Sequence, residues 1–255
     1  MDSIVISNVD NGIGEVILND EETKNSLSKQ MFIELRRVIE KLERDDSVKV
    51  IIIRGTGDSF SSGVNLKERL NMSDNESEEL RSNIVIPFYQ YMDNIKKPVI
   101  AAINGYAVGG GFELALGADI IIASDNAKFG QREVKWGIIP AGGALRKLPH
   151  IVGILKAKEL IFTGRIIDAE EAYKIGLVNM VVPGDKLMEK AREIAMEIRE
   201  NSIFSVAMAK RFLNAMQNQN TLSILEIEAS NICYSSEDRR EGMKAFSEKR
   251  KPVYK

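Results

Sequence analysis

The sequence predicts an α/β fold built on a parallel sheet and followed by a helical C-terminal segment. The first half of the chain alternates between strand-like and helix-like stretches, which is typical of α/β proteins. Residues 48–53 are all apolar and β-branched except Lys49, a pattern that is typical of a strand buried on both faces. Beyond Gly184 nearly all of the chain has helix-like patterning. We therefore expect a core over residues 1–195 and a helical segment over residues 196–255.

The N-terminal elements follow from a turn signal and a helix cap. Residues 4–9 and 15–18 are expected to be short strands, because the Asn11-Gly12 pair between them is a strong hairpin signal. Ser28 is a suitable N-cap for a helix over residues 29–44. The apolar residues of that helix recur on one face with a period of 3.6 residues. They are Phe32, Leu35, Val38, Ile39 and Leu42.

The later elements follow from the same rules. A second amphipathic helix is expected over residues 76–95, in which Pro87 marks either a kink or a new start. Asp168 and Glu171 form a D-x-x-E capping pattern for a helix that ends at Gly176. Further strands are expected over residues 99–102, which Pro98 opens, and over residues 119–123 and 178–182.

Composition excludes several classes of function. In the 255 residues, 35 lysines and arginines face 37 aspartates and glutamates, a net charge of −2, which offers no basic field for nucleic acid. Cys233 is the only cysteine, so no intrachain disulfide can form and a reducing compartment is expected. The first residues lack a signal-peptide pattern, and no apolar run is long enough to span a bilayer. We expect a cytoplasmic protein with no membrane partner.

Histidine is nearly absent, which narrows the chemistry further. His150 is the only one, so a metal site with several histidines is excluded and a Ser-His-Asp triad would depend on this residue alone. We interpret His150 as structural or solvated. Carboxylates are therefore the better candidates for general acid and base catalysis.

A run of three glycines, Gly109-Gly110-Gly111, joins a buried strand to a short helix. Such a run is costly, because glycine loses more backbone entropy on folding than any other residue. One interpretation is a tight turn that lets the strand and the helix pack closely. The other is a helix N-terminus whose N–H groups bind a ligand oxygen. A turn usually needs only one or two glycines, so we favour an anion or oxyanion site.

Two glutamates are the candidate acid and base. Glu113 lies early in the helix after the glycine run, among apolar neighbours that favour burial; the alternative is a charge at a solvated helix N-terminus. Glu133 lies in a polar stretch after the strand at 119–123, where an exposed loop charge is the alternative. Residues 60–66 are mostly small and polar, and Gly63 allows a bend that exposes the next N–H; a plain loop is the alternative.

The order and spacing of these segments resemble the enoyl-CoA hydratase/isomerase (crotonase) superfamily over essentially the whole chain, most of all its two-glutamate enoyl-CoA hydratases. The segments that carry the resemblance are Asn19 with residues 24–27 (KNSL), residues 60–64 (FSSGV), residues 97–105 (KPVIAAING), the glycine run with Glu113, residues 129–133 (FGQRE), Thr163-Gly164, residues 237–242 (EDRREG), Ala245-Phe246 and residues 248–250 (EKR). The resemblance implies a right-handed spiral of β-β-α units, and a C-terminal helical segment that forms trimers, commonly paired into hexamers.

The resemblance also assigns binding residues. In the family, two backbone N–H groups hold the thioester oxygen, and by motif these fall on Val64 and Gly110. Coenzyme A is expected to bind along residues 64–67 and to meet two lysines with its phosphates, one of them from a neighbouring subunit. The implied contacts are Lys24, Val64, Asn65, Leu66, Lys67 and Lys249.

The implied reaction is the reversible addition of water to a 2-enoyl-CoA, in fatty acid metabolism. Both family acid/base positions hold glutamate, Glu113 and Glu133, which favours a hydratase. The alternative is a Δ3,Δ2-enoyl-CoA isomerase or another thioester-enolate enzyme, with Glu133 acting alone. A remoter one is a non-catalytic binding protein, since some relatives bind RNA. No metal, redox cofactor or covalent intermediate is expected; the coenzyme A is part of the substrate.

Some positions depart from the family pattern. Asn65 stands where aspartate is usual, and Arg132 stands where proline is frequent, next to Glu133, whose ionised form its charge favours. Residues 140–146 carry alanines where glycines are usual, which predicts a differently shaped loop beside the water site. The region 70–85, with Arg69 and Arg81 around it, is expected to shape the acyl pocket without specifying a ligand.

Overall fold

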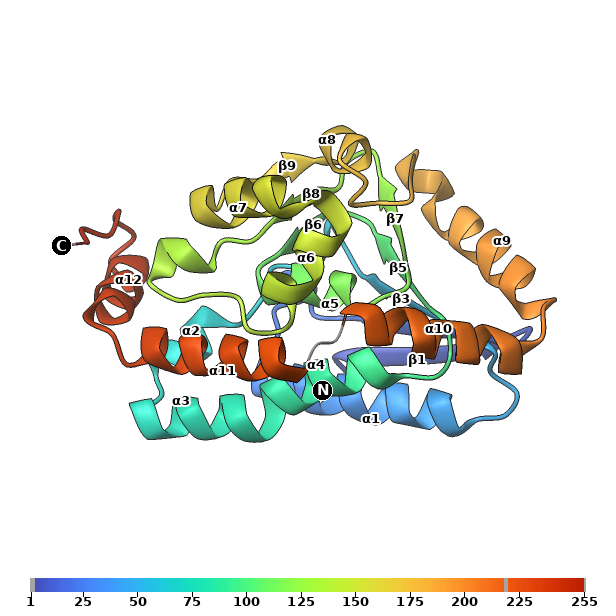
Figure 1. Cartoon of the computed structure of the whole chain (residues 1–255), viewed down its shortest axis with the longest axis horizontal. Coiled ribbons are helices and arrows are strands. Elements are labelled where there is room, and N and C mark those ends of the chain that lie inside the picture. Colours follow the sequence, from blue (N-terminus) through green and yellow to red (C-terminus); the bar gives the residue numbers. More distant parts are fainter. Residues whose placement is uncertain (1–2, 218–219, 255) are drawn as a thin grey trace.

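The computed structural model describes residues 3–217 and 220–254 of the chain. It has two sheets surrounded by helices (Figure 1). The strands are β1 (Val5–Asp10), β2 (Ile13–Leu18), β3 (Val50–Gly55), β4 (Ser59–Ser61), β5 (Val99–Ile103), β6 (Tyr106–Val108), β7 (Ile120–Ser124), β8 (Lys128–Gly130), β9 (Ile167–Asp168) and β10 (Met180–Val182).

The two sheets advance together along the chain. The larger has the order β1-β2-β3-β5-β7-β10 and is parallel except for the β1–β2 hairpin. The smaller has the order β4-β6-β8-β9 and is parallel except at β9. Each of β3, β5 and β7 is followed in the chain by its counterpart β4, β6 or β8 in the smaller sheet. This repetition is the predicted succession of β-β-α units.

Helices cover both faces of the larger sheet. The α-helices are α1 (Lys29–Arg44), α2 (Leu66–Leu70), α3 (Asp74–Leu80), α4 (Ile86–Asn94), α5 (Gly110–Leu116), α6 (Ala144–Val152), α7 (Ile154–Thr163), α8 (Ala169–Lys174), α9 (Leu187–Arg199), α10 (Ile203–Gln217), α11 (Asn220–Tyr234) and α12 (Glu237–Ser247). Shorter turns are the 3₁₀-helices η1 (Glu21–Thr23), η3 (Glu133–Trp136) and η4 (Gly184–Lys186), and the π-helix η2 (Arg81–Val85). Within the described ranges, no helix has the length and apolar character needed to cross a bilayer.

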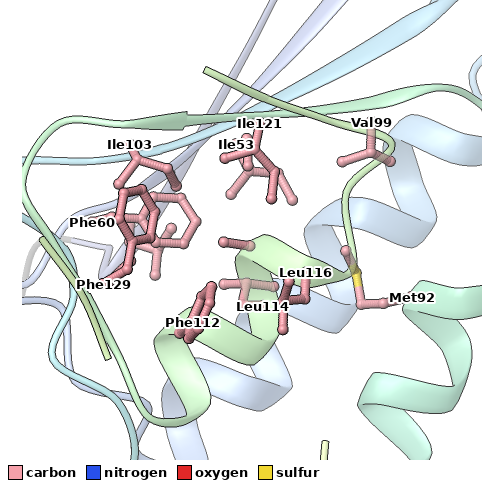
Figure 2. Close-up of a cluster of buried hydrophobic side chains, with 14 of the residues drawn as sticks. Ile53, Phe60, Met92, Val99, Ile103, Phe112, Leu114, Leu116, Ile121 and Phe129 are labelled. Carbon is pink, nitrogen blue, oxygen red and sulfur yellow. The ribbon is translucent and has the colours of Figure 1, made fainter. Parts of the chain in front are cut away.

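Strand β3 is buried on both faces, as its sequence predicted. Ile51 and Ile53 point into the main core with α1 and α5, whereas Val50 and Ile52 pack on the other face with α9. Figure 2 shows Ile53 and other strand residues above the apolar side of α5. Replacing one such isoleucine by alanine removes buried surface and leaves a cavity, at a cost of about 2–5 kcal/mol. The site described below is therefore carried by strands and helices whose side chains form a well-packed core.

Most local predictions are confirmed. Ser28 caps α1, because its side chain accepts a hydrogen bond from the N–H of Met31 at 3.1 Å. The helix expected over residues 76–95 is confirmed as one continuous helical stretch made of α3, η2 and α4. Pro87 lies in the first turn of α4, directly after the π-helix η2, and the backbone before it is helical, so it marks an irregularity within a continuous helical stretch and not a new start. His150 is exposed in the last turn of α6. Helices α6 and α7 and the second sheet were not predicted.

The C-terminal helices α10, α11 and α12 pack on the same chain's core. Lys210 of α10 bonds through its Nζ to the carbonyl oxygen of Lys97 at 2.9 Å and to Asp119 Oδ2 at 2.7 Å. The helical character predicted beyond Gly184 is confirmed. The boundary proposed at residue 195 falls inside α9, and the division of the chain into two units stays a prediction.

Candidate active site

The glycine run forms a close junction between β6 and α5. Gly109 has φ 54° and ψ −128°, a conformation that side chains disfavour, and its N–H bonds to the carbonyl oxygen of Gly130 at 2.8 Å. A Cβ placed on Gly111 would lie 2.5 Å from the carbonyl oxygen of Ser61. Backbone conformation thus accounts for Gly109, and close packing accounts for Gly111 and also for Gly110, on which a Cβ would lie 2.9 Å from the hydroxyl of Tyr89. Gly110 is the first residue of α5, so its N–H has no acceptor within that helix.

The bend at Gly63 brings Val64 to this junction. Gly63 has φ +87°, and a Cβ placed on it would lie 2.5 Å from the carbonyl oxygen of Val108 and 3.3 Å from the nitrogen of Gly110. Val64 forms a parallel bridge with Leu27 that uses the N–H groups of Leu27 and of the residue after Val64. The N–H of Val64 therefore points away from that bridge. The structure brings the two predicted oxyanion residues together. Neither of their N–H groups is used by the hydrogen bonds of the helix or bridge to which the residue belongs.

Glu113 is buried beside the junction, with 5% of its surface exposed. It lies in the first turn of α5, but because it is buried there, the predicted alternative of a solvated helix end is wrong. Its Oε1 accepts hydrogen bonds from the N–H of Gly142 at 2.7 Å and from the N–H of Ala144 at 3.1 Å. These donors belong to the loop in which alanines replace the usual glycines. That loop orients the carboxylate, a role that sequence analysis did not assign to it.

Glu133 approaches the same junction from η3. A Cβ placed on Gly109 would lie 3.0 Å from its Oε1, which also accepts a hydrogen bond from Gln131 Nε2 at 3.3 Å. Its Oε2 is sealed from solvent and bonds to no group of residues 3–217 and 220–254. The predicted alternative of an exposed loop charge is therefore wrong. An acceptor oxygen without a protein partner is suited to a proton-transfer role.

Burial controls the charge of Glu133. It raises the pKa of this carboxyl from 4.5 to about 7, and the nearby backbone of Glu133 and Arg132 offsets only part of this rise. The guanidinium of Arg132 was expected to favour the ionised form; the net direction is the opposite, because desolvation outweighs every nearby attraction. A carboxyl that titrates near neutral pH can both give and take a proton there.

Tyr89 of α4 joins the parts of this site, and sequence analysis missed it. Its hydroxyl donates to the carbonyl oxygen of Gly110 at 2.8 Å, and its ring fills the space that a Cβ on Gly142 would need. Burial, with added repulsion from Glu113 and Glu133, raises the pKa of Tyr89 well above its usual range, so the hydroxyl keeps its proton. No local pattern distinguishes this tyrosine from a core aromatic, because its contacts come from distant parts of the chain.

Comparison with known proteins agrees with this geometry. The sequence profile of the family described as Enoyl-CoA hydratase/isomerase matches residues 8–255. The chain belongs to the enoyl-CoA hydratase/isomerase family. It is 41% identical over 98% of its length to a protein of Arabidopsis thaliana named probable enoyl-CoA hydratase 2, mitochondrial, of which the match covers 83%. It is 40% identical over 97% of its length to the short-chain-enoyl-CoA hydratase of Clostridium acetobutylicum, of which the match covers 95%.

Solved structures of the enoyl-CoA hydratase/isomerase family share the fold. The crystal structure of an enoyl-CoA hydratase from Bacillus anthracis superimposes with a TM-score of 0.81 at 36% identity, and the match covers 99% of each chain. The predicted crotonase-like α/β fold is thus confirmed over the whole chain, including its C-terminal helices.

In this enoyl-CoA hydratase/isomerase family member, most of the predicted coenzyme A contacts lie next to the junction. Asn65 caps α2 by accepting from the N–H of Glu68 at 3.0 Å, a role that aspartate fills equally well, so this departure is neutral for the fold. Leu66 and Lys67 begin α2, and Lys67 is exposed. The carbonyl oxygen of Lys24 accepts from the N–H of Ser62 at 3.0 Å, beside the bend. Lys249 follows α12 and is exposed; its role was predicted for a neighbouring subunit and stays a prediction.

Proposed function

We propose that the chain is an enoyl-CoA hydratase that adds water reversibly across the double bond of a 2-enoyl-CoA to give a 3-hydroxyacyl-CoA. One observation carries the proposal: both family acid/base positions hold glutamate, and both side chains converge on the junction of residues 109–110. Glu133 Oε1 lies beside Gly109, and Glu113 lies one helical turn after Gly109 in the chain. The charges of both glutamates raise the pKa of Tyr89. Relatives at about 40% identity that are named hydratases over the whole chain support this activity.

The oxyanion residues would stabilise the charge that develops on the substrate. Addition of water to a conjugated thioester moves negative charge onto the thioester oxygen. In the proposal, the N–H groups of Val64 and Gly110 donate to that oxygen. Preorganised donors of this kind contribute about 3–4 kcal/mol each to transition-state stabilisation in other acyl-transfer sites.

The two carboxyls would share the proton transfers. Glu113, oriented by the N–H groups of Gly142 and Ala144, positions the water and takes its proton as oxygen attacks C3. Glu133 delivers a proton to C2 through its unpartnered Oε2, and removes it in dehydration. General acid and base catalysis of this kind contributes about 10²–10⁴-fold. This route uses no metal, redox cofactor or covalent intermediate, and coenzyme A enters as part of the substrate.

Crotonyl-CoA tests the proposal. The wild-type protein is expected to remove the conjugated absorbance of crotonyl-CoA and to form 3-hydroxybutyryl-CoA. If crotonyl-CoA is untouched while a 3-enoyl-CoA is converted to its 2-enoyl isomer, the isomerase assignment replaces the hydratase. If neither is converted, the non-catalytic binding role that the sequence left open is favoured.

We also propose that the chain assembles as a trimer or a pair of trimers. Large apolar side chains of α10 remain exposed on the single chain, which supports a contact with another subunit. They are Phe204, Met208, Phe212 and Leu213. Light scattering coupled to gel filtration is expected to give three or six times the chain mass, and a monomer would refute this assignment. A cytoplasmic location stays a prediction from the single cysteine.

A further inference from the structure

Three of the buried arginines gather around one tyrosine, apart from the proposed catalytic residues. Arg69 of α2, Arg81 at the start of η2 and Arg239 of α12 have only 3%, 4% and 7% of their surface exposed. The guanidinium carbon of Arg81 lies 3.7 Å from the ring centroid of Tyr234 in α11, and that of Arg239 lies 5.0 Å from it. Buried arginines are uncommon unless an anion pairs with them.

In this cluster, Arg69, Arg81 and Arg239, each arginine has an acid in its surroundings, Glu68, Glu78 and Asp74 in turn, but only Arg239 pairs directly with its acid. Arg239 pairs with Asp74 at 2.7 Å, but the side chain of Asp74 is 67% exposed. Within the described residues, Arg81 donates to two neutral oxygens, Ser230 Oγ at 2.8 Å and Asn231 Oδ1 at 3.0 Å. Among the described residues, Arg69 and Arg81 thus lack a directly bonded carboxylate.

Arg69 is the member with unused hydrogen-bonding capacity. Its Nε and Nη1 are sealed from solvent and meet no acceptor anywhere in the described part of the chain. The neighbouring acid on α2, Glu68, instead accepts hydrogen bonds from the backbone N–H of Lys29, at 3.0 and 3.2 Å. Burial lowers the pKa of Arg69, and the charge of Arg239 adds to that lowering. An arginine left in this state destabilises the fold, so a role in ligand binding would account for it.

The cluster borders the proposed reaction centre. Arg69 follows the oxyanion residue Val64 by little more than one helical turn, and it faces inward while Lys67 faces solvent. Its charge acts on the hydroxyl of Tyr89, which donates to Gly110. Helix α12, which carries Arg239, contacts both α2 and η3, the turn that begins with Glu133. An acyl chain held at the oxyanion junction would thus have this cluster as part of its surroundings.

We propose that Arg69, supported by Arg81 and Arg239, binds a carboxylate at the far end of the acyl chain, so that the preferred substrates are 2-enoyl-CoA thioesters whose acyl group ends in a carboxylate. This inference rests on the proposed hydratase function. A guanidinium offers a carboxylate charge-assisted hydrogen bonds in a fixed plane. The phosphates of coenzyme A are a poorer match, because their predicted lysine contacts are on the surface.

The test compares two five-carbon substrates, 4-carboxybut-2-enoyl-CoA and the neutral pent-2-enoyl-CoA. Hydrogen bonds to a charged group predict that wild-type kcat/KM is about 10- to 100-fold higher for the carboxylated substrate. Arg69→Met should abolish this preference while hydration of the neutral substrate persists. Arg69→Lys should keep part of it, and Arg37→Met, which removes an exposed charge on α1, should leave it unchanged. Without substrate, Arg69→Met should also melt at a higher temperature than wild type, because an unpaired buried charge is removed.

The outcomes separate this inference from the function on which it rests. If the neutral substrate is hydrated as well as the carboxylated one by wild type, or if Arg69→Met leaves the ratio unchanged, the carboxylate site is refuted and the hydratase stands. If neither substrate is hydrated, the proposed function itself fails. If inorganic phosphate raises the melting temperature of wild type but not of Arg69→Met, and wild type shows no substrate preference, the cluster binds a free anion and the acyl assignment is overturned.

Discussion

Replacing Glu133 by glutamine separates the chemical role of this residue from its cost to the fold. Glutamine has nearly the same shape but cannot exchange a proton with C2 of the substrate. If Glu133 is the proton carrier, kcat for crotonyl-CoA hydration should fall by about 10²–10⁴-fold, with KM little changed. Glu237→Gln, which neutralises an exposed carboxylate at the start of α12, is the matched control and should keep wild-type activity.

The same substitution should stabilise the protein at alkaline pH. Folding raises the pKa of Glu133 from 4.5 to about 7. Below pH 4.5 the carboxyl is protonated in both the folded and the unfolded chain, so it costs nothing. Between pH 4.5 and 7 the unfolded chain ionises while the folded chain stays protonated, so the fold loses stability over this range, and the loss levels off above pH 7 at about 3 kcal/mol. Glu133→Gln removes this cost, so its melting temperature at pH 8 should exceed that of wild type by several degrees.

Two measurements decide the matter: hydration rates followed by the loss of conjugated absorbance, and thermal unfolding at pH 5 and pH 8. A variant that loses activity and gains stability only at the higher pH supports a buried proton carrier. A variant within about threefold of wild-type kcat would refute the assignment of Glu133, since general acid catalysis contributes far more than that.

Three further predictions concern the same junction. The reaction has no net proton uptake, so the glutamate pair must hold one proton in both directions. We therefore expect kcat/KM to fall above about pH 7 for hydration and dehydration alike. A pH profile that stays flat to pH 9 would contradict the pKa of about 7 for Glu133. Tyr89→Phe removes the hydrogen bond to Gly110 and should lower kcat about tenfold without changing KM; an unchanged kcat would show that the hydroxyl does not position the oxyanion turn. Gly63→Ala would place a Cβ 2.5 Å from the carbonyl oxygen of Val108, and should reduce kcat/KM by about 10²–10³-fold by displacing an oxyanion donor, with folding checked by circular dichroism.

Local patterns were enough to predict the frame of the molecule. Ser28 caps α1 as its sequence context indicated, and β3 is buried on both faces because its apolar run has no polar side. These features depend on neighbours within a few residues. Pro87 could be assigned to a kink or to a new start only from coordinates, because both satisfy the same local rule.

The parts of the site that sequence reasoning missed depend on contacts between distant segments. Glu113 is oriented by the N–H of Gly142, twenty-nine residues away, and Tyr89 reaches Gly110 across twenty-one. The charge of Arg132 next to Glu133 suggested a lower pKa, whereas burial, which adjacency in sequence does not reveal, raises it. Glutamates were correctly singled out as candidates, but their environments could not be inferred from their neighbours in the chain.

Two glycines allow the backbone of the C-terminal helix α12 to pack directly against the backbone around η3. A Cβ on Gly137 would lie 2.3 Å from the carbonyl carbon of Asp238, and one on Gly242 would lie 2.4 Å from the carbonyl oxygen of Trp136. Main chain thus touches main chain, with no side chain between them to absorb a displacement. Any event that moves α12, such as docking of another subunit against the C-terminal helices, would be transmitted directly to the turn that begins with Glu133. Quaternary assembly and catalytic competence would then be set by the same few contacts.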